Sequence, residues 1–159
     1  MSKMFNNYIG KAGQLFAMSE FLMLGWNVAI PEVDRGDDIF VVKDDNGELR
    51  RVQVKTAQAK DTAGSYTVQF SLPRLQLLFP QIQFYFFLLV RRNNNWSDLF
   101  VITGQNLAVM LAERLKSGTG VKNVNLSIKV NTKTGKATSG HIDFTPCRNI
   151  KGLFDEIAH

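Results

Sequence analysis

The stretch DDIFVVKDDNGELRRVQVKT, residues 37–56, contains two short apolar runs joined by a turn. Asn46-Gly47 between the runs is a strong signal for a β-hairpin. Asp38 opens the first run, and Gln53 and Lys55 alternate with valines in the second. Side chains alternate between the two faces of a strand, so we expect Gln53 and Lys55 to project together into a cleft beside Asp38.

These three side chains suit one kind of chemistry. A carboxylate oxygen at Asp38 and an amide oxygen at Gln53 are ligands that Mg²⁺ or Mn²⁺ accepts. The ammonium group of Lys55 can orient a water molecule and stabilise charge on phosphoryl oxygens. Asp37 is the alternative acid, but the alternation of apolar residues after Asp38 favours Asp38. The pattern therefore predicts metal-assisted hydrolysis of a phosphodiester.

The composition predicts one cytoplasmic domain that spans residues 1–159. The chain is 45% hydrophobic, which is enough to bury a substantial core. Cys147 is the only cysteine, so an internal disulfide and a multi-cysteine zinc site are both excluded. The longest apolar run, residues 84–90, is too short to span a bilayer, and residues 1–10 contain no apolar signal core.

Basic residues are concentrated in the second part of the chain. Residues 1–61 carry eight basic and nine acidic residues, whereas residues 62–159 carry eleven basic and five acidic residues. Residues 116–151 contain seven basic residues and one acid, Asp143. Such a region is either a solvated lysine-rich face or a surface that contacts nucleic-acid phosphates.

Periodicity and turn residues predict an order of elements typical of an α/β or α+β domain with three layers. Phe84 to Arg91 is a continuous apolar run of the kind that is buried on both faces of a sheet. Helices are predicted at residues 7–24, 72–79, 106–116 and from about 150, and strands at 26–30, 38–43, 49–58, 66–71, 84–91, 99–103, 124–130 and 141–144.

Residues 38–42 and 51–56 resemble the core motif of the PD-(D/E)XK nucleases, a superfamily that includes restriction enzymes, archaeal Holliday-junction resolvases and some intron-homing endonucleases. Residues 10–14 and 25–28 are similar to the helix that precedes this motif in resolvase-like members. The resemblance covers residues 9–58. It implies a restriction-endonuclease-like core with a central mixed sheet flanked by helices, and a Mg²⁺-dependent or Mn²⁺-dependent endonuclease that cuts DNA.

The resemblance assigns a role to each residue of the motif. It makes Asp38 the metal-binding acid and Lys55 the lysine of the motif. Gln53 occupies the position at which the family usually has Glu, although certain homing endonucleases carry Gln there. The resemblance therefore implies that Asp38 and Gln53 bind the metal, and that Lys55 completes the catalytic set.

The first helix offers two candidates for the further acid that the family carries there. Gln14 lies at the family position, and Glu20 is the only acid in the predicted helix. At 100° per residue, the two side chains point about 120° apart, so one helix cannot easily direct both at the same metal. If Gln14 faces the site, two of the usual carboxylates are amides and the affinity for Mg²⁺ must fall.

Several basic residues are candidates for binding DNA phosphates. Arg35 and Arg51 flank the predicted cleft, although ion pairing with neighbouring acids would explain them equally well. The remaining candidates are Lys122, Lys129, Lys133 and Lys136. The alternative to an enzyme is a catalytically weakened module that binds nucleic acid or a protein. A homodimer or a partner subunit is a possible source of sequence specificity.

Overall fold

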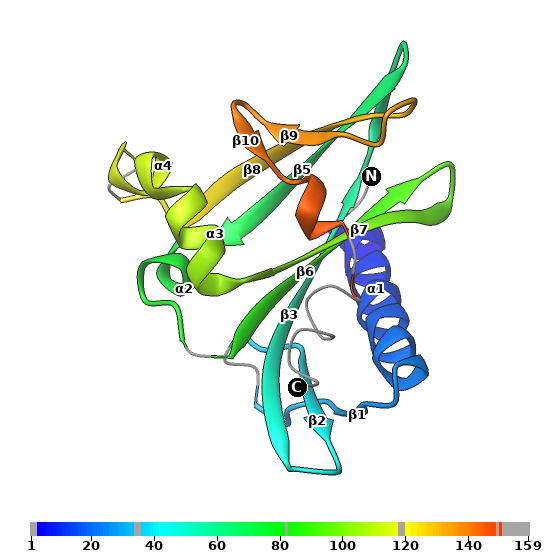
Figure 1. Ribbon diagram of the computed structural model, residues 1–159, viewed down its shortest axis with the longest axis vertical. Coiled ribbons are helices and arrows are strands. Elements are labelled where there is room, and N and C mark those ends of the chain that lie inside the picture. The colour runs from blue at the N-terminus through cyan, green and yellow to red at the C-terminus, as the bar shows by residue number, and fades with distance from the viewer. Residues whose placement is uncertain (1–2, 34–35, 82, 118–119, 149, 151–159) are drawn as a thin grey trace.

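The computed structural model describes residues 3–33, 36–81, 83–117, 120–148 and 150. The chain folds into two five-stranded sheets and a few helices (Figure 1). The elements are α1 (Lys3–Met23), β1 (Asn27–Ala29), β2 (Ile39–Lys43), β3 (Glu48–Gln58), β4 (Lys60–Thr62), β5 (Ser65–Pro73), α2 (Arg74–Leu78), β6 (Phe84–Arg92), β7 (Asn95–Thr103), α3 (Gly104–Met110), α4 (Ala112–Ser117), β8 (Asn123–Asn131), β9 (Ala137–Ser139), β10 (Ile142–Asp143) and the 3-10 helix η1 (Thr145–Cys147).

The first sheet is mixed and has the strand order β1-β2-β3-β6-β7. β3 and β6 pair in parallel, and the other neighbours pair antiparallel. The second sheet is antiparallel throughout and has the order β10-β9-β8-β5-β4. β3 and β4 follow each other almost without interruption, so this part of the chain passes from the first sheet into the second.

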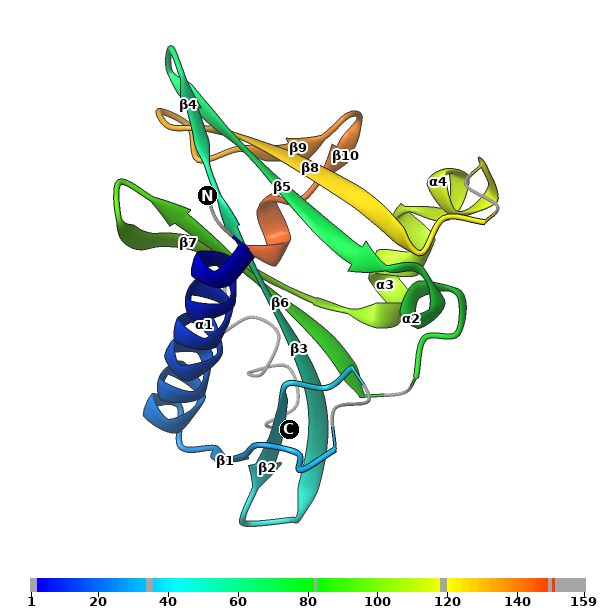
Figure 2. The ribbon, with the colours of Figure 1, turned by 180° about the vertical axis from the view of Figure 1, so that it is seen from behind.

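The strand β6 lies at the centre of the layers. Residues 84–90 are all buried, as the continuous apolar run predicted. Tyr85, Phe87 and Leu89 pack toward α1, together with Val52 and Val54 of β3. The residues that alternate with them pack toward the second sheet, whose inner face supplies Val68, Phe70, Leu72, Leu126 and Ile128. The layers are therefore helix, mixed sheet and antiparallel sheet, as Figures 1 and 2 show from opposite sides.

The prediction of a mixed α+β fold is confirmed, and the details differ in three places. The expected central mixed sheet has α1 on one face, and its other face is covered mainly by the second sheet, which was not expected. The predicted helix at 106–116 is two short helices that meet at Leu111. The strands β4 and β9 were missed because each has only three residues. The helix predicted from about residue 150 lies almost entirely outside the described residues.

The helix α1 lies directly against β3 at Gly13. A Cβ atom at position 13 would lie 2.2 Å from Cγ2 of Thr56, a distance that real atoms do not adopt. A Cβ atom at Gly10, one turn earlier, would meet nothing within 4 Å. Glycine at 13 therefore sets how closely the helix approaches the strand that carries the predicted site.

We predict opposite effects for alanine at these two glycines. Gly10→Ala should stabilise the protein by up to about 1 kcal/mol, because alanine favours the helix. Gly13→Ala should destabilise it by about 1–3 kcal/mol, because the new methyl group overpacks the interface. Adding Thr56→Ala should recover part of the loss. Urea unfolding measures all three. Stabilisation by Gly13→Ala alone would contradict this close helix–strand contact.

Candidate functional site

The candidate site lies where β2 separates from β3. The last residue pair of the two strands is Ile39 with Val52. Just before β2, the backbone N–H of Asp38 donates to Val52 O at 2.9 Å. Beyond this point the side chain of Asp38, instead of a β2 backbone group, is the hydrogen-bonding partner of β3. Its Oδ2 accepts the backbone N–H of Val54 at 2.7 Å. The carboxylate is thereby fixed against the edge of β3 that β2 leaves uncovered.

The helix α1 contributes two polar side chains beside Asp38. Nε2 of Gln14 donates to the backbone oxygen of Asp38 at 2.6 Å. Oε1 of Gln14 accepts a hydrogen bond from Nζ of Lys11 at 2.8 Å. Both ends of the amide are thus engaged, and this pattern determines its orientation. An amide suits this position because a carboxylate at 14 would face the carbonyl oxygen of Asp38.

An open groove of about 440 Å³ runs between α1 and β3 at this point. Lys55 and Asp38 both line it, so the structure brings these two predicted residues together. The lining residues are Asn6, Asn7, Gly10, Lys11, Gln14, Asp38, Val54 and Lys55. The sequence reading missed Lys11, although its position one helical turn before Gln14 places it on the same side of the helix.

Gln53 lies on the same face of β3 as Lys55 but does not line this groove. Its side chain is only 5% exposed, because it lies on the face of β3 opposite Val52 and Val54, beside Phe86 of β6 and under the second sheet. Oε1 of Gln53 is buried and has no hydrogen-bond partner within the described part of the chain. The expectation that Gln53 and Lys55 project together into a cleft therefore holds only for Lys55. A buried oxygen without a partner costs stability, so it is a candidate ligand for a bound group.

Glu20 lies on the other flank of α1, about 120° around the helix from Gln14. Phe16, one turn before Glu20, stacks against Trp96 of β7 with ring centroids 6.0 Å apart. This flank therefore faces β7 rather than β2. Of the two predicted helix residues, Gln14 is the one that the structure brings to Asp38.

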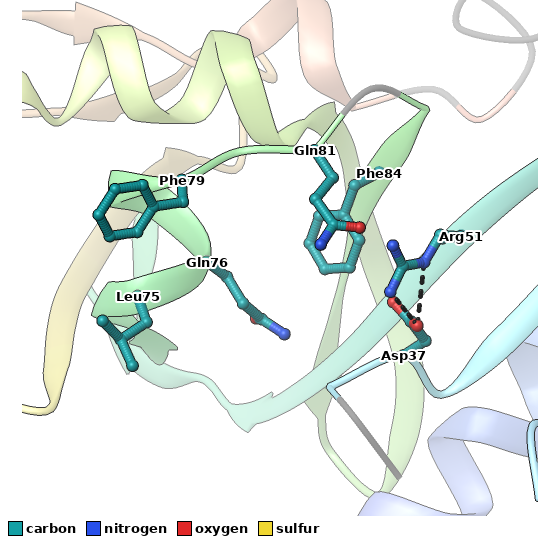
Figure 3. Close-up of a pocket in the computed structure, with 7 residues that line it drawn as sticks. All are labelled: Asp37, Arg51, Leu75, Gln76, Phe79, Gln81 and Phe84. Atoms are coloured by element: carbon teal, nitrogen blue, oxygen red, sulfur yellow. Dashed lines mark hydrogen bonds and ion pairs between the residues drawn. The ribbon is translucent and has the colours of Figure 1, made fainter. Parts of the chain in front are cut away.

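Asp37 and Arg51 form an ion pair at a second pocket, shown in Figure 3. Nε and Nη2 of Arg51 donate to Oδ2 of Asp37 at 3.0 and 2.5 Å, and Asp37 is buried. The pocket measures about 280 Å³ and reaches Leu75 on the helix α2 and Phe79 directly after it (Figure 3). Arg51 is thus paired with a neighbouring acid, as one of the two explanations offered for it from the sequence expected. Arg35 lies outside the described residues.

The four candidate lysines are exposed and lie on or near the second sheet. Lys129 is on β8, Lys122 directly precedes that strand, and Lys133 and Lys136 lie in the turn that follows it. Their roles as phosphate contacts stay predictions.

Arg148 belongs to the same basic region but is engaged inside the fold. It forms a 2.7 Å ion pair with Asp98. Asp98 also accepts the hydroxyl of Tyr66 at 2.5 Å. Burial and this hydrogen bond raise the pKa of Tyr66 far above its ordinary value. Arg148 therefore supports the packing of β5 against β7 rather than an open basic surface.

The donor set at the groove is poor in carboxylates. Among the residues that the structure describes, no three His, Cys, Asp or Glu side chains gather as a metal site would require. The two predicted oxygen donors are the carboxylate of Asp38, which lines the groove, and the amide of Gln53 on β3, which is buried and does not line it. Both are hard ligands of the kind that Mg²⁺ and Mn²⁺ accept. Together they supply one negative charge, whereas two acids would supply two.

Comparison with solved structures finds proteins of similar architecture. The chain is similar to the bacterial homing endonuclease I-Ssp6803I, with 19% sequence identity and a TM-score of 0.56. The match covers 94% of this chain and 92% of that one. The two chains share a fold. No protein-family model and no curated protein matches the sequence. None of the described helices is long and apolar enough to cross a membrane.

Two substitutions at Asp38 separate its structural bond from its charge. Asp38→Ala should destabilise the protein by about 1–3 kcal/mol, because the N–H of Val54 loses its acceptor. Asp38→Asn keeps an oxygen at the same place and should cost clearly less. Chemical unfolding of both variants tests this. Equal losses would contradict a structural role for the Val54 hydrogen bond.

Proposed function

We propose that this protein is a divalent-metal-dependent DNA endonuclease of the PD-(D/E)XK type. The observation that carries the proposal is the shared groove of Asp38 and Lys55 at the point where β2 leaves β3. The similarity to a homing endonuclease over nearly the whole chain supports it. Asp38 and Lys55 then act as catalytic residues, and Gln14 and Lys11 complete the wall of the groove.

Mg²⁺ or Mn²⁺ is the cofactor that this site would take. Asp38 and Gln53 would hold the ion, and the buried, unpartnered oxygen of Gln53 supports that assignment. A bound ion of this kind lowers the pKa of a water molecule and offsets charge on the phosphate. The ammonium group of Lys55 would hold the attacking water or a phosphoryl oxygen, and Lys11 adds a second positive charge to the same groove.

The exposed lysines of the second sheet would supply phosphate contacts outside the groove. Lys122, Lys129, Lys133 and Lys136 fit this role through their exposure and charge. Arg51 would join them only after leaving Asp37, and Arg35 is assigned to the same role from the sequence alone. One domain of residues 1–159, acting as a homodimer or with a partner subunit, would bind the DNA.

We predict that Lys55→Ala and Asp38→Asn each lower DNA cleavage by at least about 100-fold, because each removes a group that stabilises charge in the transition state. The assay is nicking and linearisation of plasmid DNA and cutting of branched DNA with Mg²⁺ or Mn²⁺. Asp38→Asn is preferred to Asp38→Ala because it preserves the acceptor for Val54.

Matched controls are available for both positions. Lys116 is an exposed lysine on α4, and Asp45 is an exposed acid in the β2–β3 turn. Lys116→Ala and Asp45→Asn should cut at the wild-type rate. A robust wild-type activity that survives both Lys55→Ala and Asp38→Asn would exclude this groove as the active site.

A second prediction tests whether Gln53 is close to the metal. Gln53→Glu places a carboxylate in a buried position, so the metal-free variant should be less stable than the wild type. Mn²⁺ should then raise its melting temperature more than it raises that of the wild type, because the ion binds the folded state. Gln58→Glu, on an exposed position of the same strand, serves as the control. An equal Mn²⁺ effect in both variants would argue against Gln53 as a ligand.

The low carboxylate count favours one alternative, a nuclease-like module that binds nucleic acid without cutting it. Among the described residues that line the groove, Asp38 is the one acid. Such a module would show no cleavage, while its affinity for duplex DNA would fall with salt. The expected log–log slope is about −0.9 for each phosphate neutralised. A salt-independent interaction would instead indicate a protein partner.

A further inference from the structure

The outer surface of the second sheet carries an ordered array of polar side chains. On β5 and β8, every second residue is buried in the core, and the residues between them point away from it. The outward residues pair across the strands as Thr67 with Lys129, Gln69 with Ser127 and Ser71 with Asn125. We refer to these six residues as the polar face.

The side chains of the polar face are not used for polar contacts inside the protein. Within the described part of the chain, none of the six side chains forms a hydrogen bond or an ion pair, and the bond at Asn125 is made by its backbone oxygen. Asn125 is a poor residue for a strand, and serine and glutamine add little to one. The donors and acceptors of the polar face are therefore available to an external partner.

The spacing of these side chains matches duplex DNA. Alternate residues of a strand are about 6.8 Å apart, which is close to the rise of two base pairs. β4 pairs with β5 only at residues 65–67, and β9 pairs with β8 only at residues 129–130. The rows at Gln69 and Ser71 are therefore only two strands wide, and the major groove admits a two-stranded ribbon.

The β8 edge of this ribbon is not open for another strand at Asn125. Arg114 of α4 donates to the backbone oxygen of Asn125 at 3.0 Å. An extended peptide added to that edge of β8 would have to displace this bond, whereas a duplex can contact the side chains of the polar face without displacing it.

The charge around the polar face also suits DNA. Lys60 of β4 lies in the same cross-strand row as Thr67 and Lys129. The neighbouring acid, Asp61, is paired with Arg92 at 2.6 Å. Lysines that flank uncharged amide and hydroxyl groups are the combination that contacts phosphates and base edges together.

The polar face adjoins the candidate active site. Gln69 lines a pocket with Asn6, Gln58 and Arg91, and Asn6 also lines the groove that contains Asp38 and Lys55. In Figure 2 the N-terminal end of α1 points toward the part of the molecule that holds β4 and β5. One duplex can therefore pass from the groove onto the polar face.

We propose that the polar face contacts base pairs in the major groove of the DNA, and that the same DNA is cut at the protein groove that contains Asp38 and Lys55. Gln69 and Asn125 are the specificity-determining residues, since such amides bond adenine through two hydrogen bonds, while Lys129 beside them contacts phosphate. The inference rests on the proposed function, but it can fail while the endonuclease assignment stands.

The test is a selection of bound sequences from randomised duplex DNA in the presence of EDTA, which prevents cutting. The readout is the affinity for the selected duplex divided by the affinity for unselected duplex. The wild type should select a preferred sequence, and Gln69→Ala combined with Asn125→Ala should lower the ratio by about tenfold or more. Gln105→Ala, an exposed glutamine on α3, is the control and should keep the wild-type ratio. Circular dichroism of each variant monitors the fold.

Two results would overturn the inference. The first is a wild-type protein that binds duplex DNA without sequence preference or fails to bind it. The second is a preference that the double variant retains. Plasmid cleavage by the wild type with Mg²⁺ is measured in parallel, because it tests the proposed endonuclease independently. Cleavage together with an unchanged preference would reject only the role of the polar face.

Discussion

The burial of β6 on both of its faces is the constraint on which the other layers depend. A strand that carries seven buried residues in a row needs apolar cover above and below, and it needs hydrogen-bonding partners on both edges. β3 and β7 supply the edges, α1 supplies one face, and the second sheet supplies the other. The site-bearing strand β3 is thereby held between a helix and a sheet, with Gly13 allowing the helix to approach.

This arrangement explains why the candidate site lies at the middle of β3, where the pairing with β2 ends. β2 covers only the first part of that strand, so the remaining edge is exposed to α1 and to solvent. Asp38 lies where the pairing of β2 with β3 ends, and its carboxylate accepts the backbone N–H of Val54 on β3. The same residue thus stabilises the end of the hairpin and presents a charge to the groove. Any loss of function on mutating it must be separated from a loss of stability.

The chemistry of the groove differs from a site built on several acids. Gln14 donates to a backbone carbonyl and accepts from Lys11, whereas a carboxylate at 14 would repel that carbonyl. Gln53 is buried with its oxygen unpartnered. The groove is lined by one carboxylate, three side-chain amides and two lysines, a set of charges that favours an anionic partner such as a phosphate and holds a cation less firmly than several acids would.

The hairpin at residues 37–56, the buried strand β6 and the alternation that puts Gln53 and Lys55 on one face of β3 can be predicted from the amino-acid sequence, because they follow from local turn chemistry and from periods of two. The sequence also predicts that one helix cannot easily direct both Gln14 and Glu20 at the same metal, since helix geometry gives the angle between them. It does not predict which of them meets Asp38, how deeply Gln53 is buried, or that a second sheet covers β6. These features come from the tertiary fold, because each depends on contacts between segments far apart in the chain.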